Sequence, residues 1–132
     1  MIFAYIGAAV FGLLGVGHLA YTLSDLFSVP RYFSPTDPTV LDAMKHTHAR
    51  IAPRGQTYWK TLLGFHLSHA MGVLMFALLI FITAHERVGW MMPITSGIGL
   101  TFIVIAWRCW FPPPLVGITI GTLLISAVWI IG

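Results

Sequence analysis

Charged side chains are scarce in this chain of 132 residues, of which only 8% are Asp, Glu, Lys or Arg. A soluble globular domain carries roughly 25% charged residues. At the same time 58% of the residues are hydrophobic, so the chain lacks the charge that would hold a surface in water. This composition excludes an ordinary soluble domain and predicts that lipid covers most of the surface.

The chain also lacks the residues that several common chemistries need. Cys109 is the single cysteine, which excludes an intrachain disulfide and a paired-cysteine redox motif. Neither a Walker motif nor a Gly-rich dinucleotide fingerprint is present. The seven Lys and Arg residues form no basic run, so the net charge of +3 does not indicate nucleic-acid binding. No basic residue precedes the first apolar segment and it has no clear cleavage site, so we interpret it as a retained span.

Four long apolar segments are present, at about 2–23, 57–83, 90–110 and 114–131. Each reaches the roughly 20 residues, within a few, that a helix needs to cross a bilayer. The sequence therefore predicts an all-α fold: an integral membrane four-helix bundle that forms a single transmembrane domain over residues 1–132.

The loop 24–56 is the only sizeable segment predicted outside the membrane. Asp37 and Pro38 have the pattern of an N-cap followed by a first-turn proline. Beyond them, apolar and weakly polar side chains fall at helical spacing: Leu41, Met44, His48 and Ile51. We expect a short amphipathic helix on the membrane surface that ends at Pro53, with a disordered loop as the alternative.

Basic residues are distributed unevenly between the two sides of the predicted bundle. Six lie on the side of the long loop: Arg31, Lys45, Arg50, Arg54, Lys60 and Arg108. Arg87 alone lies opposite. The positive-inside rule then places the long loop in the cytoplasm and both termini outside. We therefore expect a multi-pass membrane protein with this orientation.

Small residues recur at a spacing of four in two of the spans. Gly64, Ser68 and Gly72 lie in the second span, and Gly117 and Gly121 form a GxxxG motif in the fourth. Small residues let helix backbones approach closely in lipid, so we predict helix packing at both stripes. The same residues could equally mediate a homo-oligomer or contacts within a larger membrane complex.

Polar side chains gather toward the cytoplasmic ends of the spans. The candidate ligand-binding residues are His18, Tyr21, His66, His69 and Arg108. His66 and His69 share a helix face because they are three residues apart. Polar groups in lipid usually face the bundle interior, so we predict that neutral histidines line a polar cavity open to the cytoplasmic leaflet. In the alternative, each group only forms an interhelical hydrogen bond. We expect the other histidines at the surface: His46, His48 and His85.

A metal or haem b site is the second possibility, because His18 and either His66 or His69 lie at similar depth on different spans and haem can be held by two histidines. The carboxylates are predicted to lie outside the spans or at their edges: Asp25, Asp37, Asp42 and Glu86. A channel or proton pump would usually need an intramembrane carboxylate, so neither class is favoured. No residue can be assigned a catalytic role.

Three segments carry a resemblance: GVGHLAYT at 15–22, Trp59 followed by GFHLSH at 64–69, and WRCWF at 107–111. With them the chain resembles an uncharacterised family of small bacterial four-span membrane proteins over nearly its whole length. The resemblance implies the four-span fold and no particular activity, and it adds that the membrane is a bacterial inner membrane. Members of that family tend to carry Asn at the position of His66. The resemblance therefore favours other positions as a shared site: His18, Tyr21, Trp59, Ser68 and His69.

The function expected from the sequence is that of a non-catalytic membrane protein without a cofactor. It would be a binding or accessory subunit that holds a small or lipidic ligand in its polar cavity or packs into a larger complex. The alternative is a haem- or metal-dependent membrane oxidoreductase that uses His18 and His69.

Overall fold

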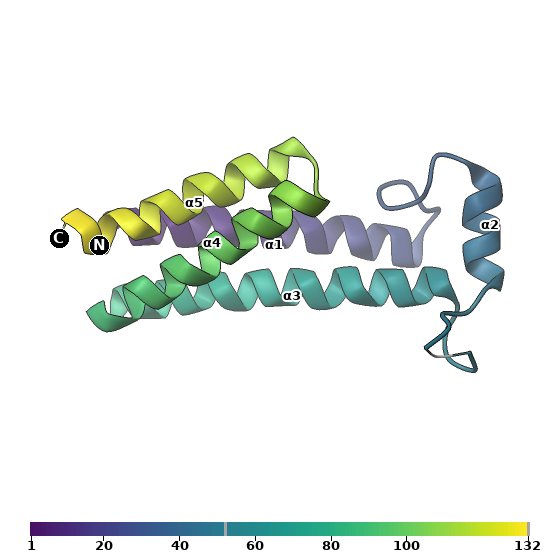
Figure 1. Cartoon of the computed structure of the whole chain (residues 1–132), viewed down its shortest axis with the longest axis horizontal. Coiled ribbons are helices and arrows are strands. Elements are labelled where there is room, and N and C mark those ends of the chain that lie inside the picture. The colour runs from purple at the N-terminus through teal and green to yellow at the C-terminus, as the bar shows by residue number, and fades with distance from the viewer. Residues whose placement is uncertain (52, 132) are drawn as a thin grey trace. The chain divides into compact units, whose positions relative to one another are not determined.

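The structure, a computed structural model, describes residues 1–51 and 53–131 of the chain. Its helices follow in the order α1 (Ile2–Phe27), α2 (Pro38–His46), α3 (Tyr58–His85), the short 3₁₀ helix η1 (Gly89–Met91), α4 (Met92–Cys109) and α5 (Pro112–Ile131) (Figure 1). The described residues contain no β-strand beyond one isolated bridge. The predicted all-α fold class is therefore confirmed.

Four helices are long and apolar enough to cross a membrane. They are α1, α3, α5 and the continuous stretch of η1 and α4, with 26, 28, 20 and 21 residues. This is the architecture of a multi-pass membrane protein. α1 continues to Phe27, past the predicted end near residue 23, so the last turn of this helix includes Asp25.

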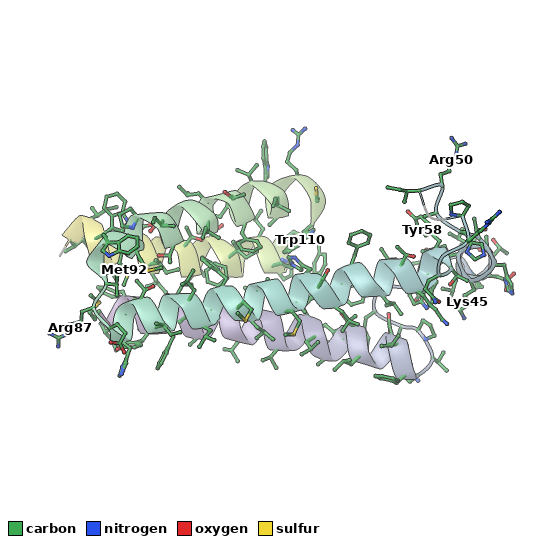
Figure 2. The ribbon with its side chains drawn as sticks, turned by 90° about the horizontal axis from the view of Figure 1, so that it is seen from below. Lys45, Arg50, Tyr58, Arg87, Met92 and Trp110 are labelled. Atoms are coloured by element: carbon green, nitrogen blue, oxygen red, sulfur yellow. The ribbon has the colours of Figure 1, made fainter. Side chains whose placement is uncertain are left out.

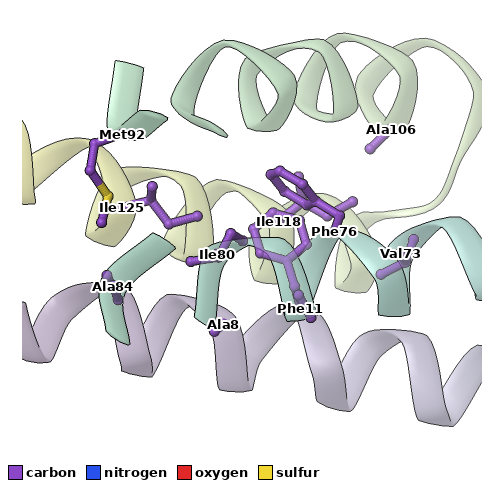
Figure 3. Close-up of a cluster of buried hydrophobic side chains, with 12 residues drawn as sticks. Ala8, Phe11, Val73, Phe76, Ile80, Ala84, Met92, Ala106, Ile118 and Ile125 are labelled. Atoms are coloured by element: carbon purple, nitrogen blue, oxygen red, sulfur yellow. The ribbon is translucent and has the colours of Figure 1, made fainter. Parts of the chain in front are cut away.

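The chain divides by its packing into two compact units, one made of Met1–Val16 with Gly72–Gly132 and one made of Gly17–Met71. The first unit contains parts of α1 and α3 together with α4 and α5. At its centre, the Phe11 ring lies edge-on to Phe76, with 4.8 Å between the ring centroids. Buried hydrophobic side chains from the four helices belong to the same cluster and extend it along the helices: Ala8, Ile80, Met92, Ile118 and Ile125 (Figure 3). The predicted four-helix bundle is confirmed in this unit.

Glycines allow α1 and α5 to approach each other closely. A Cβ atom added at Gly117 would lie 3.1 Å from Leu14, and one added at Gly121 would lie 2.8 Å from the ring of Phe11. Gly7 on α1 is equally restricted, because a Cβ there would lie 2.9 Å from Ile125. The structure thus places both glycines of the GxxxG motif at a helix–helix contact.

The second small-residue stripe does not pack within the described chain. Gly64, Ser68 and Gly72 are exposed, and a Cβ added at either glycine meets no atom within 4 Å. The buried side of α3 carries larger residues instead, among them Leu63 and Val73. Each neighbouring position is turned by about 100° around the helix, which takes the glycines away from that side. Helix packing at this stripe, including packing against a second copy, stays a prediction.

In the second unit, Asp37 caps α2 as its sequence position predicts. Its carboxylate accepts hydrogen bonds from the hydroxyl and the N–H of Thr39, at 2.7 and 2.8 Å, and Pro38 is the first helical residue. These two bonds favour the ionised carboxylate and so lower the pKa of Asp37. The helix therefore begins with a satisfied N-terminus.

The end of α2 differs from the prediction, because the helix stops at His46 and does not continue to Pro53. His48 pairs with Thr57 in an isolated antiparallel bridge, and the N–H of Tyr58 donates to the carbonyl of Thr47 at 2.7 Å. These bonds turn the chain toward α3 and leave Ile51 outside the helix, 95% exposed. Lys45 and Arg50 extend outward from this unit (Figure 2).

Candidate functional site

The candidate site lies within the second unit and begins with the buried carboxylate of Asp25, which is only 2% exposed. Its Oδ1 accepts hydrogen bonds from the backbone N–H groups of Arg31 and Tyr32, at 2.7 and 3.1 Å. Its Oδ2 accepts from Tyr32 and Phe33, at 3.2 and 2.7 Å. Bonds of this kind offset the cost of burying a carboxylate, and here they fold the chain after α1 back onto the helix.

The folded-back chain places Phe33 against two histidines. Its ring stacks on His66 with 4.0 Å between centroids and an interplanar angle of 22°. It also lies 5.1 Å from the ring of His18. An aromatic side chain from the loop thus covers imidazoles that come from two different helices, α1 and α3.

The three intramembrane histidines converge on one another. His18 Nε2 and His66 Nδ1 are 3.1 Å apart and share a hydrogen bond, whose direction depends on the tautomers. The ring of His69 meets His18 edge to face, with 5.1 Å between centroids. All three side chains are half-buried. We name His18, His66 and His69 the histidine cluster.

A carboxylate and a buried hydroxyl lie near the histidine cluster. The Asp25 carboxylate interacts electrostatically with His66. The hydroxyl of Thr22, which is fully buried, donates to the carbonyl of His18 at 2.8 Å, one turn earlier on α1. The Thr22 hydroxyl is thus satisfied within α1 and does not bond to the histidine rings.

Two further residues predicted for the site have other partners in the structure. Tyr21 is 50% exposed, and its ring stacks on Tyr32 at 4.5 Å between centroids. Arg108 belongs to the first unit, where it is exposed and its guanidinium lies 5.6 Å from the centroid of the Trp107 ring. Tyr21 thus contributes to the loop beside the cluster, and the convergence of Arg108 with the histidines stays a prediction.

The remaining histidines lie at the surface, as the sequence predicted. His46 on α2 is exposed and pairs with Asp42 one turn earlier, its Nδ1 lying 3.5 Å from the carboxylate. His48 and His85 are exposed as well. This separates the six histidines of the chain into a half-buried cluster and a surface set.

Two features of the described structure bear on the metal or haem alternative. Among residues 1–51 and 53–131, no group of three or more His, Cys, Asp or Glu side chains is arranged to hold a metal ion. The rings of His18 and His69 touch directly, at 5.1 Å between centroids, which leaves no room for a porphyrin plane between them. Haem ligation by this pair would require both side chains to move apart.

Asp25 and Phe33 were missed by the sequence reasoning. Asp25 was assigned to the extramembrane loop, and the structure shows it buried in the last turn of α1 instead. The available signal was a carboxylate followed within five residues by Pro30, since an acidic side chain before a tight turn often accepts backbone N–H groups. The contact of Phe33 with the histidines carries no local sequence signal.

No family model, no curated protein and no solved structure matches this chain. The resemblance to a family of small bacterial four-span membrane proteins therefore stays a prediction.

Proposed function

We propose that this multi-pass membrane protein is a non-catalytic binding or accessory subunit. In this proposal the histidine cluster holds a small or lipidic ligand that carries hydroxyl or carbonyl oxygens. The observation that carries it is the convergence of three imidazoles, with His18 Nε2 and His66 Nδ1 only 3.1 Å apart, on apolar helices of membrane-spanning length. Polar groups at such positions are costly and commonly mark a functional site.

The chemistry of the pair suggests what such a ligand presents. A neutral imidazole has one N–H donor and one acceptor nitrogen. Once His18 Nε2 and His66 Nδ1 bond to each other, His18 Nδ1 and His66 Nε2 remain, one as a donor and the other as an acceptor. A ligand with both a hydroxyl and a carbonyl oxygen would match both. Phe33 beside them supplies an aromatic face for an apolar or planar portion.

The surroundings of the site also belong to this proposal. A ligand dissolved in the bilayer could reach half-buried histidines on membrane-spanning helices without crossing water. We propose that the long loop lies in the cytoplasm and both termini outside, on the uneven distribution of basic residues. The resemblance to small bacterial four-span proteins is the support for a bacterial inner-membrane location. Lipid is the expected neighbour, and a homo-oligomer or a larger membrane complex is the expected partner class.

Extraction of bound small molecules tests the proposal. The full-length protein would be purified in mild detergent, extracted with organic solvent and analysed by mass spectrometry beside His18→Phe and His85→Phe variants. We expect a molecule that co-purifies with the wild type and His85→Phe proteins and is lost from His18→Phe. His85 is a matched control because it is exposed and lies in the first unit. The same set of molecules in all three preparations would contradict a ligand role for the cluster.

The alternative proposal, a haem- or metal-dependent oxidoreductase using His18 and His69, is tested on the same preparation. A Soret band, or iron or copper in stoichiometric amount, would favour the oxidoreductase and count against the non-catalytic subunit. Loss of that signal in His69→Phe would assign it to the cluster.

A further inference from the structure

We infer that the segment 28–33 is a lid over the histidine cluster and that Asp25 is the positioning residue that latches it. The inference rests on the proposed function, because it concerns access of a ligand to the same site. Two observations support it independently of any ligand. A buried carboxylate is bonded to successive backbone N–H groups, and an aromatic ring is stacked on a histidine.

The bonds of Asp25 determine the conformation of the lid. Both carboxylate oxygens accept hydrogen bonds, and three successive residues donate their backbone N–H: Arg31, Tyr32 and Phe33. The N–H of Tyr32 is shared between the two oxygens. In the described part of the chain the sole side-chain ion pair joins His46 and Asp42, so Asp25 forms none with Lys or Arg. Its charge is therefore balanced chiefly by the backbone of the lid, and the lid depends on that charge.

The latch acts directly on the residue that covers the site. Phe33 donates its N–H to Asp25 Oδ2 at 2.7 Å, and its ring lies 4.0 Å from that of His66. No flexible residue separates the bond from the cover. Loss of the bond therefore frees the ring that occupies the face of His66, and a ligand approaching that face must displace Phe33.

Asp25→Asn is the sharpest single change for this inference. Asparagine keeps the size of the side chain but replaces one acceptor oxygen with an NH₂ donor. Whichever way the amide turns, its NH₂ faces a backbone N–H, of Arg31 and Tyr32 in one orientation or of Tyr32 and Phe33 in the other. Either orientation removes the charge and two of the four contacts, and the bond from Phe33 is broken in the second orientation and deprived of the charge in the first.

Histidine labelling measures the lid without any ligand. Full-length protein in detergent micelles would be treated with diethyl pyrocarbonate, and the labelling rate of His66 would be measured by mass spectrometry relative to exposed His48. We expect this ratio to rise at least about tenfold in Asp25→Asn, the factor that the loss of a single charge-assisted bond would already give. Phe33→Ala should raise it similarly, because it removes the cover and keeps the latch. Asp42→Asn, an exposed carboxylate in the same unit, should leave it unchanged.

Each contrary result overturns a defined part of the inference. An unchanged ratio in Phe33→Ala would refute the lid, whether or not Asp25→Asn folds. A raised ratio in Phe33→Ala with an unchanged ratio in a folded Asp25→Asn would refute the latch. Labelling at wild-type ratios combined with loss of the extracted molecule in His18→Phe would refute the lid and leave the ligand function standing. Raised labelling ratios in Asp25→Asn and Phe33→Ala, with the same extracted molecules in wild type and His18→Phe, would refute only the ligand function.

Discussion

Replacing Gly99 with alanine should separate α4 from α5 in the first unit. Gly99 is buried, and a Cβ atom there would lie 2.5 Å from Oγ1, 2.8 Å from Cγ2 and 3.1 Å from Cβ of Thr122. Rotation of Thr122 gives little relief, because a β-branched side chain exchanges one γ atom for another at the contact. The helices themselves must therefore move.

The size of the effect follows from these distances. Restoring an ordinary van der Waals distance from the 2.5 Å approach requires a shift of about 1 Å. A gap of roughly 1 Å removes up to half of the van der Waals attraction of each atom pair across the interface. Overpacking of a well-packed core typically costs about 1–3 kcal/mol, and we expect Gly99→Ala to lower the free energy of unfolding by an amount in that range.

Gly97→Ala is the matched control, because Gly97 lies on the same helix and its added Cβ meets nothing within 4 Å. In a helix interior alanine is favoured over glycine by up to about 1 kcal/mol, and this gain is common to both variants. The free energy of unfolding would be measured by titrating the detergent-solubilised protein with SDS and following circular dichroism. Adding Thr122→Ala to Gly99→Ala removes both close γ atoms and should recover most of the loss. Equal stability of Gly99→Ala and Gly97→Ala would refute the close approach of α4 and α5.

Three further outcomes are expected. Single cysteines at Ser34 and after the last residue, in a Cys109→Ala background, should be labelled from opposite sides of the membrane; labelling of both from one side would refute the proposed topology. Gly64→Leu should leave the free energy of unfolding of the isolated chain within about 0.5 kcal/mol of wild type, as for other surface changes, because the position faces open space; a large loss would contradict that placement of Gly64. The Trp129 Nε1 to Ser96 Oγ bond of 3.0 Å should give a coupling of about 0.6 kcal/mol in a double-mutant cycle of Trp129→Phe and Ser96→Ala, the average for such bonds in membranes, and a coupling of zero would contradict it.

The spans were predictable because each is a long run of apolar residues, and hydropathy does not depend on tertiary contacts. The α2 N-terminus was predictable for a similar reason, since the cap of Asp37 involves only residues up to Thr39. The end of α2 depends on the pairing of His48 with Thr57, nine positions away. Local periodicity carries no information on such a pairing, so the helix was predicted too long.

Helix faces were harder to predict than helix positions. Gly64 and Gly121 have the same local pattern, a small residue repeated at a spacing of four, but only Gly121 contacts another helix in the described chain. The contact is decided by the partner side chain: Phe11 occupies the space over Gly121, and no side chain occupies it over Gly64. A small-residue motif shows where two helices could approach each other closely. It does not show whether a neighbouring helix lies there.

The histidines of the site were partly predictable, because an i, i+3 pair on an apolar helix and a histidine at similar depth on another span are both visible in the sequence. The roles of Asp25 and Phe33 were not. They depend on the course of the chain between the helices, which brings Phe33 back onto His66. The fold of this loop depends on hydrogen bonds from backbone N–H groups to Asp25. Almost any residue type can donate such a bond, so the sequence does not show which residues bond to Asp25.

The two interpretations of the histidine cluster make different demands on the chain. Interhelical bonding needs only the pair His18 and His66, and a bond of this kind contributes about 0.6 kcal/mol. Burying a carboxylate such as Asp25 costs several kcal/mol before its own bonds offset that cost. Those bonds do not join α1 to α3; they hold a loop whose last residue covers His66. Departures from the usual burial rules are expected at functional sites. The return of the loop onto His66 is what the proposed lid over a ligand site requires, whereas a bond between α1 and α3 does not require it.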